Sequence, residues 1–209
     1  MRQAEKYLSE ALRIFKKYKH YGDISGGLIN LSILETEFKN YNKAIGYCQE
    51  AQKIAQTHHF TRVEIYALFN TGNAYKSLKN YKNARLFYTK ALNLAKLNNY
   101  SHDVLLAKKH IAEIFEAEGN IADALVQYEK LKQCFTENSD KVFQQEVLER
   151  IIDIYHQQNN YYLKSITQSE LITLQQSIIK KEQEDGVHEI LKGKQEEIDL
   201  LQAKQKEIE

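Results

Sequence analysis

The sequence predicts an all-α protein, a solenoid of stacked helix pairs followed by a long C-terminal helix. The 209-residue chain has no proline and only eight glycines, so its helices can run without a break. Apolar residues recur every three to four positions in most segments, which is the helical period. A pattern of small and aromatic residues also returns every 40 residues. A fixed period of roughly 20 to 50 residues is typical of stacked repeats.

The repeat is clearest from Asn70 to Ala91, where two helices are expected to flank a tight turn at Lys79 and Asn80. Small residues are expected where the two helices touch, and aromatic residues are expected to fill the remaining gaps. A shift of 40 residues relates Asn80 to Asn40, Asn120 and Asn160, relates Ala84 to Ala4, Ala44 and Ala124, and relates Tyr75 to Phe115 and Tyr155.

The order of Gly72, Tyr75, Tyr81, Ala84, Tyr88 and Ala91 resembles the tetratricopeptide repeat (TPR) over about residues 1–175. The resemblance implies a right-handed α-α superhelix in which the first helix of each repeat lines a concave groove. The usual repeat has roughly 34 residues and ends in proline, whereas this chain has a longer period and no proline. The longer form is similar to repeats of bacterial signalling proteins and of motor and cell-polarity adaptors.

The period divides residues 1–176 into a half repeat and four full repeats. The half repeat covers residues 1–20, and the full repeats cover about 25–60, 62–100, 102–138 and 142–176. Helices are expected near 25–39, 42–58, 62–79, 82–98, 102–118, 121–136 and 142–158. Residues 20–23 and 98–101 carry turn and N-cap residues between helices. The half repeat would leave Tyr7, Leu12 and Phe15 partly uncovered, so further repeats are expected before it.

Two repeats depart from the pattern. Glu35 occupies the position of Tyr75, so either Phe38 fills the gap there or the second repeat packs loosely. In the fifth repeat, Lys164 replaces the small alanine and Gln168 replaces the aromatic residue. A buried lysine would be costly, so this helix is expected to form the solvated end of the solenoid.

Residues 177–209 form a separate segment rich in Lys, Glu and Gln. Apolar residues there alternate at steps of four and three, the spacing of a coiled-coil seam. The seam residues are Val187, Leu191, Ile198, Leu201 and Ile208, with interruptions at Lys194 and Gln205. About three heptads are marginal alone, so the segment is expected to need a partner such as a second copy, or a continuation beyond residue 209.

Composition excludes several functions. The formal net charge of +1 provides no clustered basic field for nucleic acid. No apolar run is long enough to span a membrane, and the N-terminus lacks the apolar core of a signal peptide. Cys48 and Cys134 lie two repeats apart, so they are expected to be free thiols in a reducing, cytoplasmic setting. A periplasmic location stays open if the chain belongs to a membrane-anchored protein.

No pattern in the chain predicts catalysis, a cofactor or a metal site. Gly22, Gly26 and Gly27 lack the lysine that follows the glycines of a phosphate-binding loop. His58 and His59 are adjacent, so on a helix they point about 100° apart and cannot share a metal ion. The chain is therefore expected to be a non-enzymatic protein.

The resemblance to TPR proteins implies a peptide- or protein-binding groove on the first helices of the repeats. Asn30 and Asn70 occupy equivalent positions, and an amide there can donate to and accept from a peptide unit at once. The predicted groove residues are Asn30, Ile33, Tyr66, Phe69, Asn70, Asn73, Lys76, Lys109, His110, Glu113, Arg150 and Asp153. An alternative interpretation is that these residues form ordinary solvated helix faces.

Three functions are compatible with these patterns. The first is a sensory module, resembling part of a larger bacterial signalling protein, that binds a peptide or protein and relays binding to a C-terminal coiled coil. The second is a structural scaffold for assembly or dimerisation without a ligand. The third is a regulator similar to peptide-pheromone receptors, although the N-terminal domain of those receptors has no counterpart here.

Overall fold

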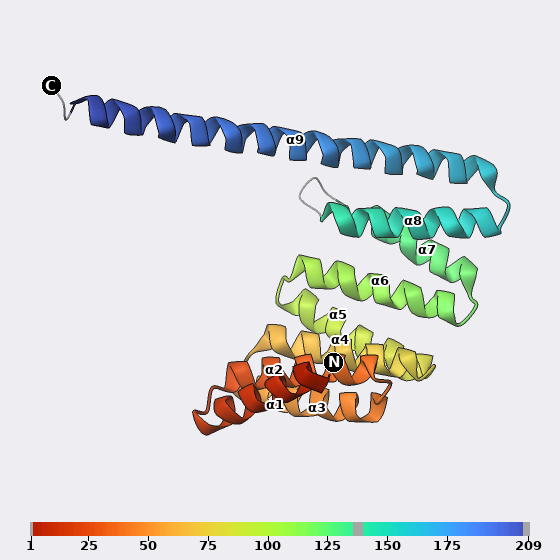
Figure 1. Cartoon of the computed structure of the whole chain (residues 1–209). Helices are drawn as coiled ribbons and strands as arrows, with labels where there is room; N and C mark the ends of the chain where they lie inside the picture. Colours follow the sequence, from red (N-terminus) through yellow and green to blue (C-terminus); the bar gives the residue numbers. More distant parts are fainter. Residues whose placement is uncertain (1, 136–139, 207–209) are drawn as a thin grey trace. The chain divides into compact units, whose positions relative to one another are not determined.

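The computed structural model describes residues 2–135 and 140–206, with side chains except those of 2, 4, 182, 187–191 and 193–206. These residues form nine α-helices and no strand (Figure 1). They fall into two compact units, one containing α1–α7 and the other containing α8 and α9. The prediction of an all-α fold is therefore confirmed.

The first unit is a stack in which each helix packs on the next. Its helices are α1 (Arg2–Lys17), α2 (Tyr21–Glu37), α3 (Tyr41–His58), α4 (Thr61–Ser77), α5 (Tyr81–Leu97), α6 (Ser101–Ala117) and α7 (Ile121–Lys132). In addition, α2 packs on α4, and α4 packs on α6. The first helices of successive repeats are therefore neighbours, as the repeat pattern requires.

The turns between helices share one backbone geometry. In each described turn, one residue adopts the left-handed conformation: Lys19, Lys39, His59, Lys79, Asn99, Gly119 and Asn159. The N–H of the next residue then bonds back to a carbonyl five positions earlier, as in Asn80 N to Tyr75 O at 2.9 Å. This is the Schellman helix ending, which satisfies carbonyls that the helix leaves unpaired. Because these residues lie 20 apart, or 40 apart across the 136–139 gap, each helix with its turn occupies 20 residues.

Small and aromatic residues meet in the core as the repeat pattern predicts. Ala84, Ala91 and Tyr88 are fully buried in the cluster formed by α4, α5 and α6. Tyr75 and Tyr81 are half-buried and pack against the same cluster. Gly72 is required beside Tyr88, because a Cβ atom there would lie 2.5 Å from the Tyr88 ring.

Several boundary predictions were wrong. The structure begins α2 at Tyr21 rather than near residue 25, so Tyr21, Gly22 and Asp23 lie in the helix and only residues 18–20 form the turn. Helix α7 ends at Lys132 rather than near residue 136. Leu12 is buried against α2 residues, although Tyr7 is exposed and Phe15 is half-buried.

Glu35 is a buried carboxylate in the second repeat, which the repeat pattern did not predict. Its side chain is only 1% exposed, at the position that Tyr75 occupies in the next repeat. The carboxylate accepts hydrogen bonds from the Lys43 ammonium and from Asn40 Nδ2, the latter at 2.8 Å. Burial alone would raise the pKa of Glu35, but these hydrogen bonds outweigh burial and hold the pKa below its usual value. A charged network thus joins the two helices where other repeats use an aromatic ring.

The second unit is a pair of packed helices, α8 (Lys141–Gln157) and α9 (Tyr161–Lys206). Helix α9 contains 46 residues against 17 in α8, and it continues through Gly186 without a break. Among the described side chains of α9, Thr167 and Leu174 are buried, Gln168 is exposed and Lys164 is half-buried.

The division at residues 176 and 177 stays a prediction, because α9 crosses it as one helix. The coiled-coil seam also stays a prediction. Val187, Leu191, Ile198 and Leu201 lie in α9 outside the described side chains, and Ile208 lies outside the described residues.

The left-handed turns predict opposite effects for two glycine substitutions. Gly119→Ala should destabilise the protein by about 1 kcal/mol, because Gly119 has φ +80° and alanine is strained there. Gly46→Ala should stabilise it by about 0.5–1 kcal/mol, because Gly46 lies within α3 with no atom near the added Cβ. Urea unfolding of both variants measures this, and equal effects would contradict the turn geometry.

Candidate functional site

Helices α2, α4 and α6 present equivalent side chains in rows. Residues three to four apart lie on one face of a helix, and the 40-residue period repeats each position on the next first helix. One row contains Asn30, Asn70 and His110, a second contains Ile33, Asn73 and Glu113, and a third contains Gly26, Tyr66 and Leu106. We call the face formed by these rows the α2–α4–α6 face.

This face combines exposed apolar and polar side chains. Ile33 and Tyr66 are 43% and 38% exposed, and Asn30 is also exposed. Phe69, a predicted groove residue, is instead only 4% exposed and belongs to the core. Its ring lies 5.7 Å from that of His110, so it contributes to the face by supporting this histidine.

The side-chain amides of Asn70 and Asn73 on α4 each form a hydrogen bond within the protein. Asn70 Nδ2 donates to the carbonyl oxygen of Tyr66 at 2.9 Å. Asn73 Oδ1 accepts from the Tyr88 hydroxyl at 2.7 Å. The oxygen of Asn70 and the nitrogen of Asn73 take no part in these two bonds, so each amide keeps one group for a ligand.

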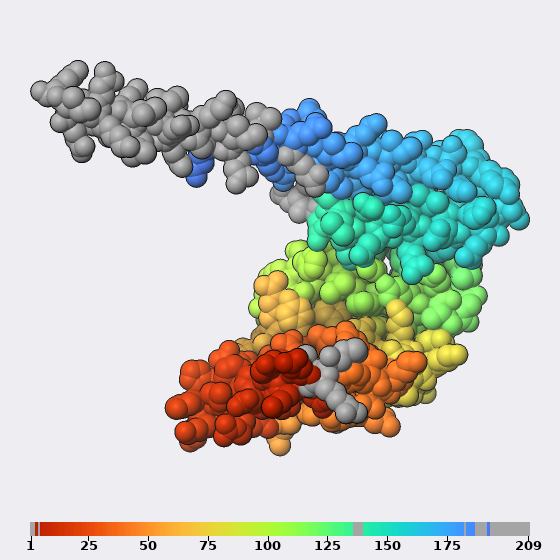
Figure 2. Space-filling view, in the orientation of Figure 1, coloured from red at the N-terminus to blue at the C-terminus, as the bar shows by residue number. Residues whose placement is uncertain are grey.

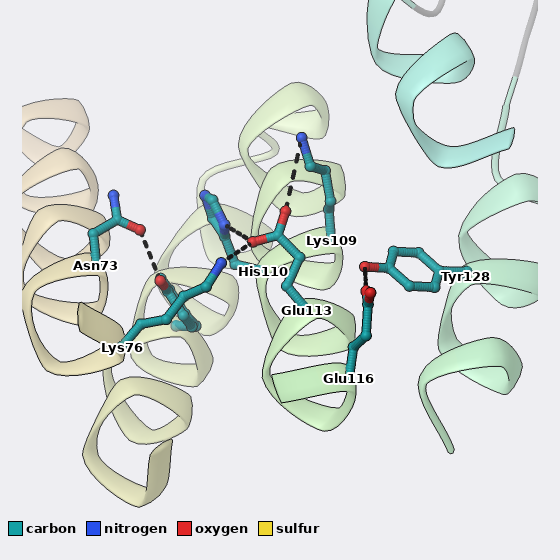
Figure 3. A network of polar contacts seen from close by, with 8 residues as sticks. Asn73, Lys76, Lys109, His110, Glu113, Glu116 and Tyr128 are labelled. Atoms are coloured by element: carbon teal, nitrogen blue, oxygen red, sulfur yellow. Dashed lines mark hydrogen bonds and ion pairs between the residues drawn. The ribbon is translucent and has the colours of Figure 1, made fainter. Parts of the chain in front are cut away.

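Glu113 is the centre of a polar network that joins α4 to α6 (Figure 3). Its carboxylate lies 2.5 Å from Lys76 Nζ, 3.2 Å from His110 Nδ1 and 3.9 Å from Lys109 Nζ. Lys76 and Glu113 come from successive repeats, so this ion pair joins the third repeat to the fourth.

Burial and neighbouring groups act against each other on Glu113. Burial would raise the pKa of its carboxyl, but the hydrogen bond and charge of His110 and the Lys76 ammonium lower the pKa to about 2. Glu113 therefore stays ionised across the physiological range and holds the Lys76 ammonium and the His110 imidazole on the α2–α4–α6 face.

Aromatic contacts fix the orientation of His110. Its ring stacks on Tyr88 at 4.8 Å between centroids, with an interplanar angle of 15°. Burial, assisted by the Glu113 charge, raises the pKa of Tyr88, so its hydroxyl stays protonated and donates to Asn73. The next repeat has the same tyrosine, Tyr128, whose hydroxyl donates to Glu116 at 3.1 Å (Figure 3).

The structure brings together most of the predicted groove residues. Those on α2, α4 and α6 lie on neighbouring helices of one unit, whereas Arg150 and Asp153 are exposed residues of α8 in the other unit. The sequence patterns did not indicate the bond between Lys76 and Glu113 or the support from Tyr88. The 40-residue shift relates Asn73 to Glu113, but a shift does not show which side chains bond across two repeats.

Within the part of the chain that the structure describes, no helix is both long and apolar enough to cross a bilayer. Among the same residues, no three His, Cys, Asp or Glu side chains are grouped to hold a metal ion.

The successive helices of the first unit form adjoining bands of surface, from red to green, in the space-filling view (Figure 2).

The fold defines the class of protein. Residues 65–98 match the sequence profile of the tetratricopeptide repeat, so this segment is a tetratricopeptide repeat. No match to a curated protein sequence is found. The repeat expected from the sequence is confirmed for residues 65–98, and the fold of the helix stack is that of a TPR solenoid.

Solved structures share this fold at low identity. BtubC from P. vanneervenii is 16% identical with a TM-score of 0.70, over 85% of this chain and 74% of that chain. The apo form of RapI is 15% identical with a TM-score of 0.66, over 81% of this chain and 49% of that chain. A Rap protein complexed with competence and sporulation factor is 13% identical with a TM-score of 0.63, over 82% and 51%. This chain therefore spans about half the length of the Rap proteins.

The lowered pKa of Glu113 predicts a pH-dependent stability difference. A carboxyl whose pKa is depressed in the folded state stabilises the protein above its ordinary value of 4.5, and this contribution is lost as the pH falls towards about 2. Glu113→Gln should therefore cost about 3 kcal/mol at pH 7, and the difference from wild type should shrink between these pH values.

Glu10→Gln is the control for this measurement, because Glu10 is an exposed carboxylate on α1. Urea unfolding at several pH values measures both variants. A constant difference between Glu113→Gln and wild type from pH 7 to pH 2 would contradict the assigned network.

Proposed function

We propose that this chain is a non-catalytic TPR module that binds an extended peptide segment of a protein on its α2–α4–α6 face. The observation that carries the proposal is the combination of exposed Ile33 and Tyr66 with the amides of Asn30 and Asn70 on adjacent helices. Amides can bond a peptide backbone of any sequence, while apolar side chains select among ligand residues.

The polar network supports a preorganised face. Lys76, His110 and Glu113 hold one another in place. The rings of Tyr88 and Phe69 contact the imidazole and fix its position. Because these side chains are ordered before a ligand arrives, less conformational entropy is lost on binding. The similarity to a Rap protein solved with competence and sporulation factor favours a peptide ligand and a regulatory role like that of peptide receptors.

The proposal includes a relay to α9. Ligand binding across three first helices would change the curvature of the stack, and α9 would pass this change to a pairing partner, as in the sensory part of a signalling protein. We place the module in the cytoplasm, where the free thiols of Cys48 and Cys134 would stay reduced.

A dimerisation scaffold is the second candidate function, and the surface of α9 favours it. Tyr162 is 75% exposed, and Ile166, Ile172 and Ile179 are also exposed. At about 100° per residue, Tyr162, Ile172 and Ile179 lie on the side of α9 opposite the buried Thr167 and Leu174, and Ile166 lies at the edge of that side. An apolar face of this kind is suited to a second copy of the helix.

The groove proposal predicts that two amides control peptide affinity. Peptides selected from a random display library against the intact chain should bind about tenfold more weakly to the Asn30→Ala, Asn70→Ala double variant, because each lost hydrogen bond costs about 0.5–1.5 kcal/mol. Fluorescence anisotropy measures the affinity.

The matched control is the Gln49→Ala, Asn93→Ala double variant, which removes two exposed amides from α3 and α5. Equal affinity of both double variants for every selected peptide would argue against binding on the α2–α4–α6 face.

The scaffold function predicts a dimer held by α9. Sedimentation of the full chain should show a dimer that the Ile172→Glu, Ile179→Glu double variant converts to monomer, because like charges would face each other in an apolar contact. The control replaces two exposed apolar residues of α5 and α7, Leu86→Glu and Val126→Glu. A wild-type monomer at all concentrations would exclude the scaffold function.

A further inference from the structure

Two cavities lie at the turns that join the first and second helices of neighbouring repeats. The first, of about 480 Å³, is lined by Lys39, Asn40, Tyr41, Asn42, Lys43 and Leu78. The second, of about 440 Å³, is lined by Asn73, Lys76, Ser77, Lys79, Tyr81 and Ala117. Both open at one edge of the stack, and we call this the turn edge.

The cavities are related by the repeat. Lys39 and Tyr41 of the first cavity correspond to Lys79 and Tyr81 of the second after a shift of 40 residues. Each cavity is also lined by a residue from the following repeat, Leu78 in the first and Ala117 in the second. The turn edge therefore presents one lysine and one tyrosine at equivalent positions of two successive repeats.

Each cavity is lined by two lysines and no carboxylate. One lysine of each pair is bound to a carboxylate outside the lining, Lys43 to Glu35 and Lys76 to Glu113. The other lysine, Lys39 or Lys79, is exposed and forms no ion pair with a described residue. Anion-binding capacity at the turn edge thus rests mainly on Lys39 and Lys79.

The N-termini of two helices also lie at this edge. Helices α3 and α5 begin at Tyr41 and Tyr81, so each cavity lies beside the positive end of a helix dipole. The left-handed turn holds the Lys39 and Lys79 backbones in one conformation, with φ of 63° and 56°. The two ammonium groups therefore extend from fixed points of adjacent repeats.

The basic character ends at the fourth repeat. The equivalent turn contains Gly119 in place of lysine and Ile121 in place of tyrosine. Glu118 and Asp123 add negative charge beside it. A ligand that follows the lysines would therefore contact two repeats and not a third.

We propose that the turn edge binds an acidic segment of a partner protein, with one anionic side chain at each cavity and an apolar residue between them against Leu78. Neighbouring helices pack about 10 Å apart, and three residues of a polyproline II segment span roughly this distance with the first and last side chains on the same side. The segment recognised would thus have two acidic residues three positions apart. This surface shares Asn73 and Lys76 with the site described above, but it does not include the amides of Asn30 and Asn70.

The test uses the full chain and a fluorescein-labelled decapeptide with two glutamates three positions apart and a leucine between them. Lys39→Asn, Lys79→Asn removes two charges while keeping a residue type that tolerates the left-handed turn, as at Asn99 and Asn159. The control, Lys53→Gln, Lys96→Gln, removes two exposed lysines from α3 and α5. Fluorescence anisotropy at low salt measures binding.

The turn-edge double variant should bind the peptide about fivefold or more weakly, and the control less than about twofold. The Asn30→Ala, Asn70→Ala variant should bind it as wild type does, so failure of the groove and failure of the turn edge remain distinguishable. Absence of peptide binding, equal weakening in both lysine variants, or tighter binding of a single-stranded oligonucleotide that the Lys39 and Lys79 changes abolish would overturn the proposal.

Discussion

The hydrogen bond that closes each left-handed turn is the constraint on which the rest of the structure depends. This bond ends each of the helices α1 to α6 at the same position of the 20-residue period. One example is the bond from Asn40 N to Glu35 O at 2.8 Å. Helices of equal length then stack with their ends aligned, and equivalent residues of α2, α4 and α6 fall in rows. The binding face and the two turn-edge cavities both follow from this alignment.

Two carboxylates, those of Glu35 and Glu113, show how individual repeats differ in their side-chain interactions while the helix arrangement stays the same. Glu35 occupies an aromatic position and is stabilised by Lys43 and Asn40 within its own repeat. Glu113 is stabilised by Lys76 from the preceding repeat. Cations and hydrogen-bond donors surround both of these carboxylates, so Glu35 and Glu113 each depend on the identity of several neighbours. Glu35 and Glu113 can therefore stand where the third repeat has Tyr75 and Asn73.

The helix pairs and the positions of Gly72, Ala84 and Ala91 could be predicted because close contact between helices restricts residue size at fixed spacing. The groove residues of α2, α4 and α6 could be placed on one face for the same reason. The burial of Phe69 and Glu35 could not be predicted, since it depends on neighbours from other helices. The 20-residue half period was missed because lysine, histidine and asparagine occupy turn positions where glycine is the usual signal.

Helix α9 is much longer than α8, so most of its length extends beyond the length of the helix on which it packs. Its 46 residues span about 69 Å, whereas the 17 residues of α8 span about 26 Å. The part of α9 beyond the length of α8 is therefore about 43 Å long. A tilt of about 5° where the two helices pack would move the far end of α9 by roughly 4 Å, which is comparable to the rise of one helical turn. A small change of packing at Thr167 and Leu174 would thus become a displacement large enough to alter which residues a partner meets.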